Sequence, residues 1–264
     1  MPERRPAAPG VARVAGVAGR RRRPPRGRRF LKIATVALVM AAAVGLVETP
    51  RAPATPPVPS LRGIDVSHWQ GAVDWRAVAG AGYRFAFVKA TEGRSRVDPA
   101  FARNRREATA AGLAVGAYHF ARPDRSPGDA LAEANAFLRV AEPSAGGLVP
   151  VLDLEASGSL GPDRLQAWVR TWLDRVRSAT GVRPAIYAGP TFWRVHMANT
   201  TDFVSYPLML ADHVTPPTVP ANGWSGLGWT IWQWSICGRV PGVSSDCVDL
   251  DALRADRMKL VTMP

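Results

Sequence analysis

Short apolar runs alternate with longer mixed stretches along the chain from about residue 61 onward. Runs of this length and composition predict strands, and the candidates are Arg62–Val66, Arg84–Lys89, Leu113–Phe120, Leu148–Leu154, Pro184–Tyr187, Tyr206–Ala211, Thr230–Trp234 and a short strand near Val248. The stretches between them favour helices over Trp75–Ala81, Pro99–Ala111, Pro127–Val140, Pro162–Thr180 and Thr191–Ala198. This alternation is typical of βα units assembled into a parallel sheet.

The number of strands narrows the fold class. Eight strands in about 204 residues fit an α/β fold made of a single irregular (β/α) barrel of the TIM-like type, with about eight strands and fewer helices. The helical pattern fades after about residue 200, so we expect loops to join the last strands. Catalytic groups of such barrels lie on the loops at the carboxyl ends of the strands.

The first 60 residues have a different composition. Residues 1–32 form a basic tail with eleven Arg or Lys and one Glu, residues 33–47 carry no charge, and residues 48–60 contain five prolines. A basic segment ahead of fifteen apolar residues is the layout of a secretory signal. As a helix, residues 33–47 would be about 22 Å long, shorter than the ~30 Å core of a bilayer. Residues 48–60 predict an extended, proline-rich linker before a domain at 61–264.

These features predict a secreted or cell-surface protein. A cleaved signal peptide and a retained anchor both stay open, the latter with membrane anchoring through residues 30–47. The formal net charge of +13 suggests a nucleic-acid binder, but +10 of it belongs to residues 1–32. Residues 33–264 hold 23 basic and 20 acidic groups, so we expect no nucleic-acid partner.

Acidic residues mark the ends of several predicted strands, and they are Asp65, Glu92, Asp153, Glu155, Asp212 and Asp249. Asp153 and Glu155 are the most informative pair, because residues two apart on a strand point to the same face. Two carboxyl groups forced together cannot both ionise easily, so one acquires a raised pKa. A protonated Glu beside an ionised Asp suits glycoside cleavage. The alternative is a salt-bridged pair at an ordinary strand end.

Other candidate residues have simpler alternatives. Asp65 could cap the following helix, and Asp249 could be a turn residue. Aromatic side chains at a barrel mouth stack on sugar rings, whereas most tryptophans of such a domain belong to its core. The aromatic candidates are Trp69, Trp193, Trp224, Trp229, Trp232, Trp234, Tyr118 and Tyr187.

Five segments of the body resemble the motifs of the family 25 glycoside hydrolases, which are lysozymes of the N-acetylmuramidase or Chalaropsis type. The segments follow the family order and are Gly63–Gln70 (GIDVSHWQ), Phe87–Gly93 (FVKATEG), Gly116–Phe120 (GAYHF), Val151–Glu155 (VLDLE) and Trp232–Leu250, which contains WQW, VPG and VDL. The resemblance covers residues 61 to about 253, essentially the whole body.

This resemblance implies an irregular β/α barrel that cleaves the β-1,4 bond between N-acetylmuramic acid and N-acetylglucosamine in peptidoglycan. It implies that Glu155 is the general acid, that Asp153 stabilises the intermediate, and that Asp65 and Asp249 are further acids of the groove. The acetamido group of the sugar could be the nucleophile, and the choice between retention and inversion stays open. We expect the substrate-binding residues to be Tyr118, Glu92, Tyr187, Trp232, Trp234 and Asp212, with supporting roles for His68 and His119.

One position departs from the family pattern. The last motif commonly ends in Asp-Leu-Asn, whereas this chain has Asp251 in place of the asparagine. If the Asp251 side chain points inward, its charge would raise the pKa of neighbouring carboxyl groups or weaken the binding of an anionic substrate.

Cys237 and Cys247 lie ten positions apart, and in an exported domain this spacing favours a disulfide, with two separate buried thiols as the alternative. The chain has no C-x-x-C pair and no H-x-x-x-H spacing, so we expect no metal and no cofactor. We expect a monomer. Two rival interpretations are another β/α-barrel hexosaminidase acting on chitin-like chains and a non-catalytic wall-binding module. The presence of all four acids favours a hydrolase over the module.

Overall fold

The computed structural model describes residues 59–264. The predicted basic tail (1–32), the apolar segment (33–47, or 30–47 as an anchor) and nearly all of the proline-rich linker (48–60) lie outside the described residues. Within the part that is described, no helix combines the length and the apolar character needed to cross a membrane.

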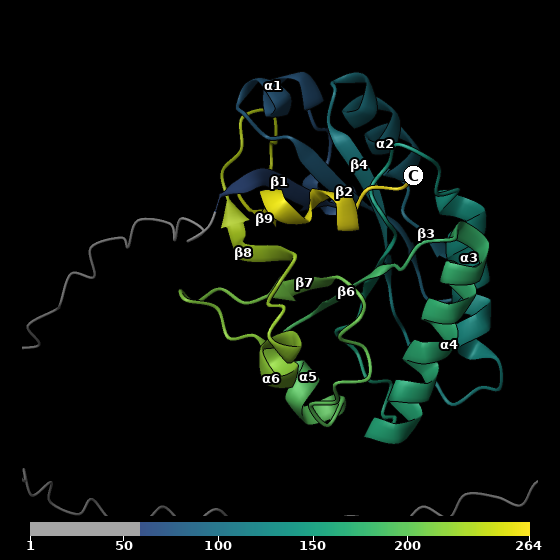
Figure 1. Cartoon of the computed structure of the whole chain (residues 1–264). Helices are drawn as coiled ribbons and strands as arrows, with labels where there is room; N and C mark the ends of the chain where they lie inside the picture. The colour runs from purple at the N-terminus through teal and green to yellow at the C-terminus, as the bar shows by residue number, and fades with distance from the viewer. Residues whose placement is uncertain (1–58) are drawn as a thin grey trace, which may run out of the picture. The chain divides into compact units, whose positions relative to one another are not determined.

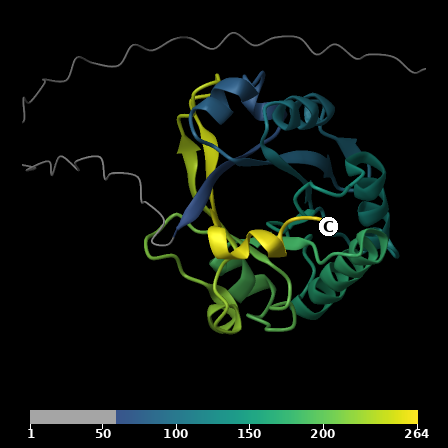
Figure 2. The ribbon, with the colours of Figure 1, turned by 45° about the horizontal axis from the view of Figure 1, so that its top comes forward.

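Eight strands close into a barrel, as the sequence predicts (Figures 1 and 2). They are β1 (Ser60–Val66), β2 (Phe85–Glu92), β4 (Ala114–Phe120), β5 (Val151–Asp153), β6 (Ala185–Ala188), β7 (Leu208–Ala211), β8 (Ile231–Gly238) and β9 (Val248–Arg254). The barrel closes because β1 pairs with both β2 and β9. A two-residue strand, β3 (Arg96–Val97), pairs with β2 outside the ring.

The last strand differs from the predicted parallel sheet. β9 runs antiparallel to both β8 and β1, whereas the other barrel strands are parallel to their neighbours. The connection from β8 to β9 is short and holds no helix, and a parallel neighbour would need a crossover of a dozen or more residues. The disulfide between Cys237 and Cys247 closes this hairpin, which confirms the predicted pairing.

The five predicted helices are present, with ends within two residues of those expected. They are α1 (Trp75–Gly80), α2 (Phe101–Ala110), α3 (Asp129–Ala141), α4 (Pro162–Thr180) and α5 (Pro190–His196). The sequence does not predict three further elements, η1 (His68–Gln70), α6 (Pro220–Ser225) and η2 (Ala255–Leu260). Residues 221–224 of α6 have φ angles between 51° and 66°, which makes this turn left-handed and outside the periodicity of ordinary helices.

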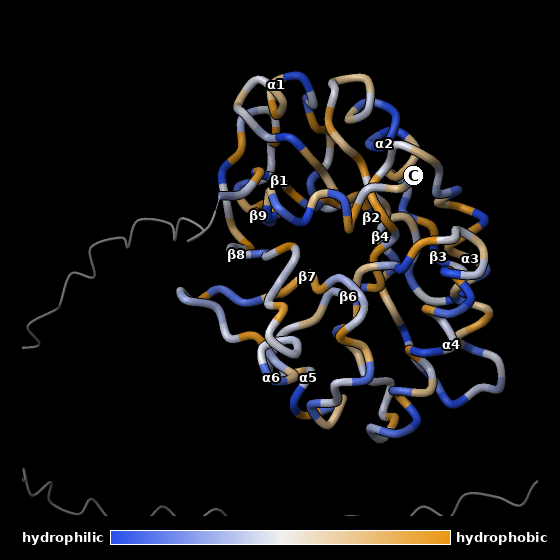
Figure 3. Tube along the Cα trace, in the orientation of Figure 1, coloured by the Kyte–Doolittle hydropathy of each residue, from blue (hydrophilic) through white to orange (hydrophobic). Residues whose placement is uncertain are grey.

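The core has two layers, because alternate residues of each strand face opposite sides of the sheet. Phe85 and Phe87 lie inside the barrel, whereas Ala86 and Val88 face the surrounding helices. A Cβ atom on Gly63 would collide with the Phe85 ring, so glycine is required for this filling of the interior. Apolar residues follow the strands around the ring (Figure 3).

The chain end closes the base of the barrel, where the parallel strands begin. Val149 donates its backbone N–H to the carbonyl of Val261 at 2.9 Å, and Met263 donates to Gly147 at 2.8 Å. Val261 and Met263 join the inner apolar layer. Residues 60–264 therefore supply the complete barrel, both core layers and the outer helices, which is what a domain needs to fold by itself.

Candidate active site

A cavity of about 220 Å³ opens at the carboxyl ends of the parallel strands. Its polar and aromatic lining consists of Asp65, Ser67, Trp69, Gln70, Phe87, Lys89, Tyr118, Phe120, Asp153, Glu155, Tyr187, Gln233 and Asp249. All four acids proposed as catalytic from the sequence, together with both candidate tyrosines, therefore meet in one place.

The end of β5 directs the first pair of acids into this cavity. Leu152 and Leu154 are fully buried on the outer side of the barrel, so Asp153 and Glu155 point to the inner side. Hydrogen bonds continue past the end of the strand, because Leu154 donates to the carbonyl of Tyr187 at 3.0 Å. Asp153 is buried, whereas Glu155 is exposed.

Asp153 is the member of this pair that has a raised pKa. Burial, followed by the charges of Glu155 and Asp65, raises the pKa of Asp153 well above its ordinary value. The spacing of the two acids predicts a protonated glutamate beside an ionised aspartate, whereas in the fold Asp153 is the member that is removed from water. The Oδ1 atom of Asp153 is buried and has no hydrogen-bond partner among residues 59–264, which adds to the cost of ionising this carboxyl group.

A second pair of acids forms between strands. Asp65 on β1 and Asp249 on β9 are direct cross-strand partners. Burial, opposed by a hydrogen bond from Gln233, raises the pKa of Asp65 to about 6. Burial and the neighbouring Asp65 charge raise the pKa of Asp249 to about 8. The two carboxyl groups thus hold one proton between them near neutral pH.

A chain of hydrogen bonds fixes Asp65. The Tyr187 hydroxyl donates to Oε1 of Gln233 at 3.0 Å, and Nε2 of Gln233 donates to Oδ2 of Asp65 at 2.8 Å. Burial and the surrounding acids raise the pKa values of Tyr118 and Tyr187, so both phenols remain neutral donors. The sequence interpretation overlooks Gln233, although Ile231 and Gln233 share the inward face of β8 and strand alternation could have identified it.

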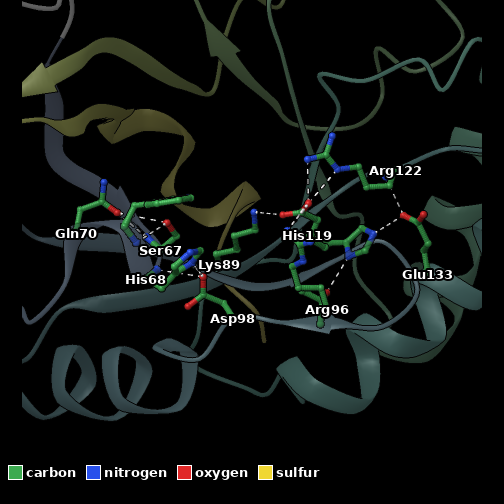
Figure 4. A network of polar contacts seen from close by, with 12 residues as sticks. Ser67, His68, Gln70, Lys89, Arg96, Asp98, His119, Arg122 and Glu133 are labelled. Atoms are coloured by element: carbon green, nitrogen blue, oxygen red, sulfur yellow. Dashed lines mark hydrogen bonds and ion pairs between the residues drawn. The ribbon is translucent and has the colours of Figure 1, made fainter.

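Lys89 (Figure 4) is the basic group in the cavity lining, and an ion pair with Glu92 holds it in place. The Lys89 Nζ donates to Glu92 Oε2 at 2.7 Å, and Arg122 donates to Glu92 Oε1 at 3.0 and 2.9 Å. Partial burial works to raise the pKa of Glu92, but the hydrogen bonds from Lys89 and Arg122 outweigh it and hold that pKa below its usual value. Glu92 thus contacts the cavity through Lys89 and does not line it.

Neither of the two motif histidines lines the cavity. His119 is fully buried and bonds Thr91 and Glu133, each at 2.8 Å, while Glu133 also accepts the backbone N–H of Arg122 at 3.1 Å. His68 bonds Asp98 at 2.7 Å. These contacts brace the segments that follow β1 and β4 (Figure 4).

A sequence model of the glycosyl hydrolases family 25 matches residues 64–243. The chain belongs to this family. It is therefore a glycoside hydrolase, as the resemblance of its motifs indicates.

Relatives and solved structures agree with this family. The chain is 38% identical over 190 residues to the Escherichia coli K12 protein YegX, an alignment that covers 70% of this chain and 66% of YegX. It is 35% identical over 219 residues to lysozyme M1 of Streptomyces globisporus, covering 77% of this chain and 71% of that protein. The crystal structure of the Streptomyces coelicolor lysozyme superposes with a TM-score of 0.70 at 34% identity, covering 76% of this chain and 95% of that one.

Four residues expected to bind substrate in this family 25 barrel lie outside the cavity, and Glu92, described above, is one of them. Trp232 is fully buried on the outer side of β8, where its Nε1 donates to the carbonyl of Asp212. Trp234 packs against the outer core layer, and the Asp212 carboxylate accepts the backbone N–H of Thr218 at 2.6 Å. Strand alternation explains why Trp232 and Trp234 do not reach the cavity, because Gln233 takes the inward position between them. The aromatic ring at the rim is Trp69, which is 77% exposed.

The departure from the family 25 motif places a third acid beneath the Asp65–Asp249 pair. Asp251 is 1% exposed, lies opposite Gly63 and Gln233 in the sheet, and neither carboxyl oxygen has a hydrogen-bond partner in the described part of the chain. Burial, followed by the charges of Asp65 and Asp249, raises the pKa of Asp251 well above its ordinary value. The side chain therefore points inward and is held as a neutral acid.

Proposed function

We propose that this chain is an exported muramidase that hydrolyses the β-1,4 bond between N-acetylmuramic acid and N-acetylglucosamine in peptidoglycan. The observation that carries the proposal is the convergence of Asp65, Asp153, Glu155 and Asp249 in one cavity at the carboxyl ends of the strands. The lysozyme names of the Streptomyces relatives support the same substrate.

In this proposal Glu155 is the general acid, since it is the accessible member of the Asp153–Glu155 pair. In the reactive state that we propose, the proton is on Glu155 and Asp153 carries the negative charge. A hydrogen bond from the acetamido N–H of the sugar to Asp153 would stabilise that charge and so move the proton to Glu155. Binding of the substrate would thereby place the proton on Glu155, where the general acid needs it.

Bond cleavage then follows from this charge arrangement. Glu155 gives its proton to the glycosidic oxygen while the carbon–oxygen bond breaks and positive charge develops at the anomeric carbon. The acetamido oxygen of the same sugar attacks that carbon, and Asp153 stabilises the positive charge. Water, deprotonated by the Glu155 carboxylate, completes hydrolysis and returns the proton.

Digestion of purified peptidoglycan by residues 59–264 tests the function. New reducing ends of muramic acid are expected. Reducing ends of glucosamine would assign a different bond, cleavage of chitin-like chains instead would assign another hexosaminidase, and wall binding without cleavage would assign a binding module.

We propose export because residues 1–47 have the layout of a secretory signal. Sequencing the amino terminus of the mature protein separates a cleaved signal from a retained anchor, and an intact chain found in the cytoplasm would contradict export.

A further inference from the structure

A second cavity, of about 520 Å³, lies at the base of the barrel, at the opposite end from the acids. Residues just before four consecutive strands line it, namely Val149, Arg183, Pro207 and Thr230. Parallel strands all begin at this end, so the cavity and the acidic mouth face opposite directions.

Basic side chains predominate at the basal cavity, with Asp174 the neighbouring acid, at 3.5 Å from the hydroxyl of the lining residue Tyr206. Arg177, Arg183, Arg257 and Lys259 line the cavity, and no Asp or Glu of the described residues does. The nearby Asp256 is engaged by Arg254 at 3.1 and 2.9 Å and lies 3.6 Å from Arg257. Arg177, Arg183 and Lys259 have no ion-pair partner within residues 59–264.

Apolar side chains are exposed beside these cations. Leu227 is 47% exposed and Leu260 is 51% exposed, and both line the same cavity. Cations alone would suit a small soluble anion, whereas cations next to exposed leucines suit the interface of an anionic bilayer, where head groups and acyl chains are both within reach.

The chain also enters the barrel at this end. The carbonyl of Pro59 accepts the backbone N–H of Ala255 at 3.1 Å, and Ser60 pairs with Arg254, immediately before η2. Residues 48–60 separate this point from the uncharged segment 33–47 and can span at most about 40 Å. A chain that passes through a membrane during export is thus connected to the base of the barrel and not to its mouth.

We propose that the base of the barrel, formed by Arg177, Arg183, Arg257, Lys259, Leu227 and Leu260, docks on the surface of an anionic phospholipid bilayer. The acidic cavity then faces away from the membrane, toward the wall. The meaning of this orientation rests on the proposed muramidase function, but the binding itself does not.

Co-sedimentation of residues 59–264 with phospholipid vesicles tests the docking. Binding to vesicles of equal phosphatidylglycerol and phosphatidylcholine is expected, with little binding to phosphatidylcholine alone and a loss as salt rises. Arg177→Glu, Arg183→Glu and Lys259→Glu together are expected to weaken binding about a hundredfold. Leu227→Ser with Leu260→Ser is expected to weaken it severalfold.

The matched control reverses three exposed arginines that do not line the basal cavity, Arg76→Glu, Arg164→Glu and Arg194→Glu, and is expected to bind within about twofold of the wild-type barrel. Equal binding to both kinds of vesicle, no binding at low salt, or equal losses in the two triple variants would overturn the proposal. Binding to a soluble glycerol-phosphate polymer but not to vesicles would also overturn it.

Hydrolysis of peptidoglycan by the same variants shows that they are folded. Since the vesicles contain no peptidoglycan, failure of membrane binding with normal hydrolysis would leave the muramidase proposal intact, and the converse result would leave the docking intact.

Discussion

The two pairs of acids in the cavity are built in different ways. Asp153 is the last residue of β5 and Glu155 follows it two positions later, and of the two only Glu155 is exposed. Asp65 and Asp249 are 184 positions apart, meet only because β9 runs antiparallel beside β1, and are tied to Gln233. The first pair is open to solvent on the Glu155 side, whereas Asp65 of the second pair is held by a hydrogen-bonded network of Gln233 and Tyr187. The two pairs thus consist of the same functional groups but differ in their access to solvent and in their hydrogen bonds, so we expect them to have different roles.

Glu155→Gln should have the largest effect, because it removes the only proton donor of the pair that we assign to the leaving oxygen. We expect turnover of peptidoglycan to fall by about a thousandfold or more, with binding retained. The control is Asp212→Asn, an acid outside the cavity, which should remain active. Turnover by Glu155→Gln close to that of the wild type would contradict the assignment of the acid.

Asp153→Asn should come next. An amide cannot take the negative charge that Asp153 carries when the proton is on Glu155, so we expect kcat to fall about a hundredfold while KM changes little. Steady-state kinetics on soluble glycan fragments would measure the two constants separately. A change confined to KM would mean that Asp153 only binds substrate.

Asp249→Asn should have a milder effect, which separates the two pairs. At pH 6 the wild-type Asp249 is protonated, because its pKa is about 8, so the amide replaces a neutral group. We expect a loss of no more than about tenfold at that pH. The wild type should lose activity as the Asp65–Asp249 pair ionises above about pH 8, and the variant should not. Parallel pH–rate profiles would contradict this role.

Asp251→Asn should change stability more than activity. The folded chain keeps a proton on Asp251 that the unfolded chain releases above about pH 4, so the free energy of unfolding falls as the pH rises from there. Asparagine removes this loss, and we expect a gain of about 1 to 3 kcal/mol at pH 7 that disappears near pH 4. Urea denaturation at the two pH values measures it, and an equal gain at both would exclude the proton as its cause.

The fold was largely predictable because periodicity is a local property. The limits of α4 follow from Pro162 at its first position and Gly181 just after its last, and the barrel follows from the count of strands. The direction of β9 was not predictable from alternation, since a strand has the same pattern in either direction. The left-handed turn α6 has no pattern to recognise.

The acids of the site also differ in whether local sequence spacing could predict their positions. The spacing of Asp153 and Glu155 is enough to place them together, whereas the meeting of Asp65 with Asp249 depends on the register between β1 and β9. The sequence marks Asp65 and Asp249 as acids at strand ends, and the family resemblance places both in the groove, but neither predicts that the two side chains meet. Trp232 was misplaced because the motif was treated as a unit, although its side chains alternate between the two faces of β8.

The filled interior of the barrel limits how a polymer can reach the acids. Phe85 and Phe87 occupy the space beneath the cavity, and Val261 and Met263 close the base. A glycan strand therefore cannot pass through the barrel. Substrate must enter, and both fragments must leave, through the same opening at the carboxyl ends of the strands.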